Sequence, residues 1–209
     1  MTSDPPAVAE SRDRGPYCET GVEEADDDAL IGKLRARAWD PALRFDMAHM
    51  VEIYADVPCG PLFPPISPAE VELAESRIGR RLPGLLRRVY TEVADGGFGP
   101  ESGLASLTDG NRTPSDPGDW PSAVRAHERG RERGMPASWL HLTSGGCSME
   151  WYVSLLAVDN PVLLYDSGGP HPTWDGCPHD GLRHATTSLR RWLSTWADGG
   201  NVRDDALGR

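Results

Sequence analysis

Residues 66–100 decide the fold, and they read ISPAEVELAESRIG, RRLPGLLRRVYTEVA and DGGFGP. Ser67 and Glu70 have the spacing of a capping box at a helix start, with Pro68 at the first helical position. Ile66 and Val71 have the spacing of a hydrophobic staple across the same helix start. Gly79 suits the left-handed conformation that ends many helices. The sequence therefore predicts a helix that Ser67 caps and that ends near Gly79.

A second helix is predicted to begin at Leu82-Pro83. Its apolar stripe recurs at helical spacing and consists of Leu86, Val89, Tyr90 and Val93. The glycine pair of Asp95-Gly96-Gly97 then interrupts the pattern, so the helix should end near Gly96. This glycine-rich loop follows a helix instead of preceding one, so it lacks the helix N-terminus that phosphate binding uses.

The order of these motifs resembles the opening of the SUKH superfamily, which includes the yeast Smi and Knr cell-wall regulators and many bacterial immunity proteins. The family pattern is Leu-Gly-x-x-Leu-Pro, an apolar helix and Asn-Gly-Gly. This chain has Ile78-Gly79, Leu82-Pro83 and Asp95-Gly96-Gly97 at the matching positions. Asp in place of Asn is a small departure, because both residues tolerate turn geometry. The resemblance covers roughly residues 33–197 and implies a non-enzymatic protein-binding domain.

Composition suits one sizeable core, since the chain has 209 residues with 38% hydrophobic and 25% charged content. The sequence contains no run of about 18 apolar residues and no basic-then-apolar leader, so we expect a cytoplasmic protein without a membrane span. Four scattered cysteines are predicted to be free thiols in a reducing compartment: Cys18, Cys59, Cys147 and Cys177.

The net charge is −11 and is concentrated at the N-terminus, where residues 1–28 carry nine acidic and two basic side chains. Direct nucleic-acid binding is not expected, because phosphate contacts need a basic surface. A basic protein partner fits this charge better. The single lysine against twenty arginines further suggests a bacterial source with a GC-rich genome.

Three parts are expected along the chain: a disordered acidic tail over 1–25, one domain over 26–199 and a polar tail over 200–209. Within the domain we predict helices from Asp28 to about Asp40 and over 120–133 and 189–196, strands over 104–107, 139–143, 149–158 and 162–165, and an ambiguous segment over 43–57. Helices, then strands, then a helix predict a single α+β SUKH-like domain, with N-terminal helices, a mixed or antiparallel sheet and a C-terminal helix.

Candidate chemistry is sparse. One loop gathers potential metal ligands (His171, Cys177, His179 and His184), but their spacing matches no common zinc module. Cys147 could act as a nucleophile on a turn, yet no base can be assigned to it. We therefore predict no catalytic residue, no metal site, no cofactor and no enzymatic activity.

Aromatic and acidic residues in or beside the predicted sheet suit a protein–protein interface, and they are Glu150, Trp151, Asp166, Trp174 and Asp175. The alternative is that Trp151 belongs to the core and the acids only face solvent. The expected function is that of an immunity protein that binds and neutralises a bacterial toxin. The competing interpretation is a general protein-interaction or regulatory scaffold without a toxin partner.

Overall fold

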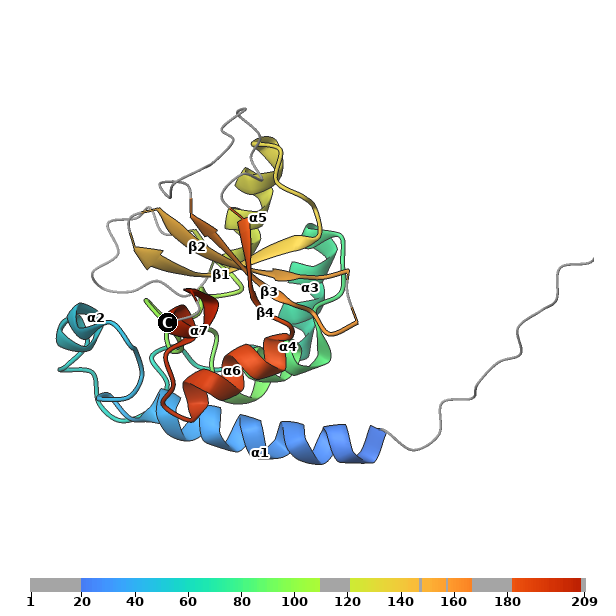
Figure 1. Ribbon diagram of the computed structural model, residues 1–209. Helices are drawn as coiled ribbons and strands as arrows, with labels where there is room; N and C mark the ends of the chain where they lie inside the picture. The colour runs from blue at the N-terminus through green and yellow to red at the C-terminus, as the bar shows by residue number, and fades with distance from the viewer. Residues whose placement is uncertain (1–19, 110–120, 147, 157, 167–181, 208–209) are drawn as a thin grey trace, which may run out of the picture.

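The computed structural model describes residues 20–109, 121–146, 148–156, 158–166 and 182–207 (Figure 1). The helices are α1 (Thr20–Trp39), α2 (Ala48–Ile53), α3 (Pro68–Ile78), α4 (Gly84–Arg88), the π-helical η1 (Val89–Val93), α5 (Ala123–Glu132), α6 (Leu189–Ala197) and α7 (Val202–Leu207). The strands are β1 (Trp139–Gly146), β2 (Met149–Ser154), β3 (Val162–Asp166) and β4 (Leu182–Thr186). This architecture confirms the predicted α+β class.

The strands form one antiparallel sheet in the order β1-β2-β3-β4. The register between β1 and β2 shifts twice, after His141 and after Ser144. Such bulges bend a strand and raise its local twist. Figure 1 shows α1 and α6 running beside each other below the sheet, and these two helices are in contact. Helix α5 contacts β1, and α7 contacts β4.

A tryptophan pair marks the centre of the core. Trp151 of β2 and Trp192 of α6 are both fully buried, with their ring centroids 5.6 Å apart. The predicted C-terminal helix is confirmed, because its apolar stripe is buried and Ser188 accepts a hydrogen bond from the Arg191 backbone N–H. The stripe consists of Leu189, Trp192, Leu193 and Trp196.

The capped helix is confirmed as α3. The Ser67 hydroxyl accepts from the backbone N–H of Glu70, and the Glu70 carboxylate accepts from the backbone N–H of Ser67 at 2.8 Å. These bonds from Ser67 hold the pKa of Glu70 below its usual value. Gly79 ends the helix with φ of 76°. Both residues of the proposed staple, Ile66 and Val71, are buried in the core.

The second helix follows Pro83 as predicted, but it does not stay α-helical. It widens into the π-helical turn η1, and Ala94 is already extended with φ of −170°. The helix thus ends at Val93, short of the predicted Gly96. Its predicted apolar stripe is buried throughout.

The loop after this helix is held by a buried carboxylate. Asp95 accepts hydrogen bonds from the Leu107 backbone N–H at 2.8 Å and from the Ser106 hydroxyl at 2.6 Å. Gly96 has φ of 77°, and a Cβ there would lie 2.5 Å from the carbonyl oxygen of Leu104. The glycine is needed because two backbone segments approach closely at this point.

Two predicted boundaries are wrong. The first helix begins at Thr20 instead of Asp28, so residues 20–25 belong to α1 and not to a tail. The predicted polar tail over 200–209 contains α7, where Val202 is buried and Arg203 forms an ion pair with Glu101. Ala206 and Leu207 also pack against the core, but a helix of six residues is too short for its periodicity to be detected in sequence.

The sheet also differs from prediction at its margins. Residues 104–107 form no strand, although Ala105 donates one hydrogen bond to the carbonyl of Leu142 in β1. Strand β2 ends at Ser154, four residues before the predicted end. Strand β4 lies in a segment whose sequence pattern indicates a polar loop.

Candidate binding cavity

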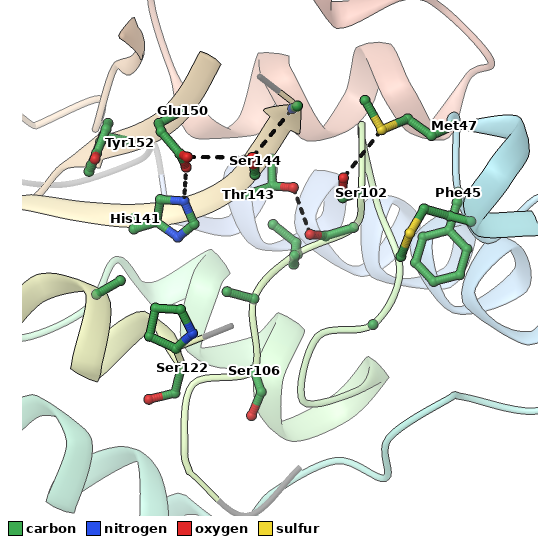
Figure 2. Close-up of a pocket in the computed structure, with 18 of the residues that line it drawn as sticks. Phe45, Met47, Ser102, Ser106, Ser122, His141, Thr143, Ser144, Glu150 and Tyr152 are labelled. Atoms are coloured by element: carbon green, nitrogen blue, oxygen red, sulfur yellow. Dashed lines mark hydrogen bonds and ion pairs between the residues drawn. The ribbon is translucent and has the colours of Figure 1, made fainter. Parts of the chain in front are cut away.

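One face of the sheet borders an open cavity of about 800 Å³ (Figure 2). Its other walls come from the segment around α2, the loop at 97–106 and helix α5. Apolar residues dominate the α2 side, and they include Phe45, Met47, Met50, Ile53, Tyr54 and Phe63. Polar residues dominate the sheet side, and they include His141, Thr143, Ser144, Glu150, Tyr152 and Tyr165. The size falls within the range of ordinary ligand pockets.

The apolar wall is held in place by a buried arginine. Arg44 donates from Nε to the carbonyl of Ala38 at 3.2 Å and from Nη2 to the carbonyl of Gly60 at 2.9 Å. Burial lowers the pKa of this guanidinium. The neighbouring Phe45 bridges to Gly99 and packs on Tyr54, with ring centroids 5.5 Å apart. The segment before α2 is therefore fixed against the loop at 97–106.

The polar wall arises from strand register. Glu150 lies opposite Tyr165, and Tyr152 lies opposite His141. Because residues two apart on a strand share a face, Glu150 and Tyr152 project to the same side. His141 Nε2 lies 2.5 Å from Glu150 Oε2, a contact that Figure 2 shows directly. These side chains form one continuous polar and aromatic surface.

Tyr152 remains a neutral phenol across the physiological range. Burial raises its pKa most, and the nearby Glu150 carboxylate and Tyr165 raise it further, against a smaller opposing effect of Arg133. The ring packs edge-on to His141, with centroids 5.5 Å apart, and edge-on to Tyr165 at 6.5 Å. Tyr152 thus supplies an aromatic ring and a hydroxyl, not a charge.

Two arginines line the cavity, one on α5 and one directly after it. Arg129 and Arg133 are exposed, and neither forms an ion pair with another described residue. The adjacent Arg125 is different, because its Nε lies 3.6 Å from Asp109. Arg129 and Arg133 therefore place positive charge beside the cavity.

The His141–Glu150 pair does not extend to a nucleophile within the described residues. Ser144 Oγ lies 3.4 Å from Glu150 Oε1, on the carboxylate and not on the imidazole. His141 Nδ1 has no hydrogen-bond partner among the described side chains and backbone groups. Acyl-transfer catalysis needs a hydroxyl or thiol at the imidazole nitrogen opposite the acid. The observed arrangement orients a histidine but activates no serine.

The predicted partner-binding residues do not all lie at the cavity. Glu150 lines the cavity with its side chain 35% exposed. Asp166 lies at the end of β3 and accepts a 2.6 Å hydrogen bond from Ser148, which also lines the cavity. Trp151 is a correction: it points to the other face of β2 and is fully buried, so it cannot contact a partner. Trp174 and Asp175 lie outside the described residues.

Most of the potential metal ligands, and the potential nucleophile Cys147, lie outside the described residues. Cys147 and three of the four loop ligands (His171, Cys177 and His179) are among the residues without a description. His184 lies in β4, opposite Leu163. Over the described ranges, no three His, Cys, Asp or Glu side chains gather closely enough to hold a metal ion. Cys59 is a free, exposed thiol.

Sequence reasoning missed His141, Tyr152 and Tyr165 as members of one site. The available signal was the alternation in 139–143, together with the two-residue spacing of Glu150 and Tyr152. The pairing of these strands could not be read from the sequence, because the bulge after His141 changes the register.

A comparison of the chain with models of known protein families finds no match, and a comparison with curated proteins also finds none. None of the helices in the described ranges has the length and apolar character needed to cross a bilayer.

Proposed function

We propose that this chain is a non-enzymatic protein-binding domain that acts in the cytoplasm as an immunity protein and neutralises a basic bacterial toxin. The observation that carries the proposal is the open cavity between the sheet and the α2 segment. It joins an apolar wall to a polar wall that contains Glu150.

The chemistry of the cavity suits a protein surface. Aromatic residues and methionine are enriched at interface cores. Met47, Met50 and Met135, three of the five methionines in the chain, line this cavity. Methionine side chains adapt their shape to a partner, since they are unbranched and polarizable. Ile53, half exposed at the rim, extends the apolar surface.

The charge of the chain supports a basic partner. A net charge of −11 attracts a cationic protein over a distance comparable with the Debye length and speeds productive encounter. Neutralisation then requires only stoichiometric coverage of the toxin surface, without turnover. The motif resemblance to SUKH immunity proteins supports the same proposal.

The test is a protection assay in the source bacterium or a close surrogate. A basic toxin encoded next to this chain is expressed with the chain, without it, and with a variant that carries bulky charges in the apolar wall, Met50→Glu with Ile53→Glu. We expect survival with the native chain only, and a 1:1 complex on co-purification. The double variant must keep a native melting transition for its loss of protection to count.

A negative result in the protection assay would count against the immunity proposal. If survival is independent of the chain and no complex forms with the toxin, the immunity proposal is lost. A stable complex with a different, non-toxic protein at the same cavity would then support the scaffold alternative.

A further inference from the structure

We propose that the sheet side of the cavity is a subsite for a cationic side chain, lysine or arginine, with Glu150 as the counter-ion and Tyr152 and Tyr165 as its aromatic walls. This inference rests on the proposed function, because it names what the bound protein places in the cavity. It is testable without the partner.

Glu150 has unused acceptor capacity toward the cavity. Its Oε2 contacts His141 Nε2 at 2.5 Å, whereas the one contact of Oε1 with the described residues is to the Ser144 hydroxyl at 3.4 Å. A carboxylate has about four acceptor positions over its two oxygens. With its side chain 35% exposed, Glu150 can accept a charge-assisted hydrogen bond from a ligand without leaving His141.

The aromatic neighbours favour a cation over a neutral group. Tyr152 and Tyr165 lie nearly at right angles, with ring centroids 6.5 Å apart and an interplanar angle of 76°. The two tyrosines flank Glu150 along β2 and across to β3. The negative face of an aromatic ring attracts an ammonium or guanidinium group, and the attraction grows as water is excluded. A carboxylate beside two such rings is therefore a favourable environment for a cation.

Other charges around the cavity repel a cationic ligand, and their removal therefore distinguishes the binding of a cation from the binding of an anion. Among the described residues, the arginines that line it are Arg129 of α5 and Arg133 directly after α5, with His49 and His141 as further titratable side chains. Both arginines are exposed, so water and salt screen their repulsion. Glu150 is more enclosed and is not paired with either arginine. Replacement of Arg133 by a neutral residue should accordingly raise the affinity for a cation, whereas it would lower the affinity for an anion.

The experiment uses the full chain and small probes. Amide NMR spectra are recorded during titration with N-acetyl-arginine amide, with its neutral isostere N-acetyl-citrulline amide and with N-acetyl-glutamate amide. We expect saturable millimolar binding of the arginine probe, with shifts concentrated at Glu150, Tyr152 and Tyr165. The citrulline and glutamate probes should leave these signals almost unchanged.

Three variants complete the test. Glu150→Gln should weaken binding of the arginine probe about three- to tenfold, and Arg133→Gln should strengthen it about twofold. Glu132→Gln removes an exposed acid of α5 outside the cavity and should have no effect. Equal binding of citrulline, preference for glutamate, or no saturable binding of arginine would each overturn the subsite. If the chain still protects against its toxin in that case, the proposed function stands without this subsite.

Discussion

The indole Nε1 of Trp196 donates a 2.8 Å hydrogen bond to Oδ1 of Asp46, which joins α6 to the segment that precedes α2. The Arg37 guanidinium lies over the same indole, 4.3 Å from the ring centroid, and 3.8 Å from Asp46. Burial nevertheless raises the pKa of Asp46 above its usual value, against the lowering effect of these partners. The ionised carboxylate is thus less favourable in the folded chain than in the unfolded one.

This relationship predicts a pH-dependent effect of Asp46→Asn. An acid with a raised folded pKa binds more protons in the folded state, so its contribution to stability falls as pH rises through that pKa. Asparagine keeps an acceptor for Trp196 but does not ionise. The stability of the variant relative to wild type should therefore increase between about pH 4 and pH 7, measured by urea unfolding. The exposed Asp56→Asn serves as a control, and an equal trend in both variants would contradict the prediction.

Two glycines with the same backbone conformation should respond differently to alanine. Gly79 has φ of 76°, and a Cβ added there would meet no described atom within 4 Å apart from the adjoining chain. Gly96 has φ of 77°, and the Leu104 carbonyl oxygen lies 2.5 Å from the Cβ position. Gly79→Ala should cost about 1 kcal/mol for the left-handed conformation alone. Gly96→Ala adds a backbone clash and should cost about 3 kcal/mol or more. Equal unfolding free energies for the two variants would show that the loop at 97–106 shifts freely.

Helix α7 should contribute to stability through one ion pair. Arg203 donates to both oxygens of Glu101, at 2.9 and 2.6 Å, and to the carbonyl of Gly145 at 2.7 Å. The Glu101 side chain is only 7% exposed, so loss of Arg203 leaves a nearly buried carboxylate unpaired. Arg203→Ala should destabilise by about 2–3 kcal/mol, less than for a fully buried pair because Arg203 itself is partly exposed.

The matched control is Arg191→Ala on α6. Arg191 is exposed, and its side chain makes no hydrogen bond or ion pair with the described residues. Its replacement should change the unfolding free energy by less than about 0.5 kcal/mol. A comparably small effect of Arg203→Ala would mean that α7 is not anchored by this pair.

Local signals explain which parts of the fold could be predicted. The capped helix and the C-terminal helix were predictable, because a capping box, a helix-ending glycine and a tryptophan-containing stripe act over a few residues. Helix α7 and strand β4 were not, because neither has a strong period and each is stabilised by distant elements. The buried pairing of Arg203 with Glu101 spans 102 positions, and no local pattern could reveal it.

In the candidate site, too, local sequence features could be predicted, whereas features that depend on distant contacts could not. Glu150 could be selected as an acid near the sheet, but its neighbours His141 and Tyr165 depend on strand pairing. The prediction for Trp151 is wrong because an aromatic beside acids suits both an interface and a core. Alternation along β2 places it on the face opposite Glu150, and packing against Trp192 then buries it completely.

The proposed complex should form and dissociate at rates that depend on different charges of the chain. Long-range attraction acts mainly on association, whereas a desolvated contact acts mainly on dissociation. Raising salt from about 0.05 M to 0.15 M should therefore slow association with the basic toxin more than it speeds dissociation.

Glu150→Gln should instead raise the rate at which the toxin dissociates, about three- to tenfold, because it removes the counter-ion inside the cavity. Glu72→Gln, an exposed acid on α3 away from the cavity, should change only association, and only slightly. Stopped-flow association and chase-induced dissociation would measure both rates. A dissociation rate that is the same for wild type and Glu150→Gln would show that Glu150 makes no energetically important contact with the toxin.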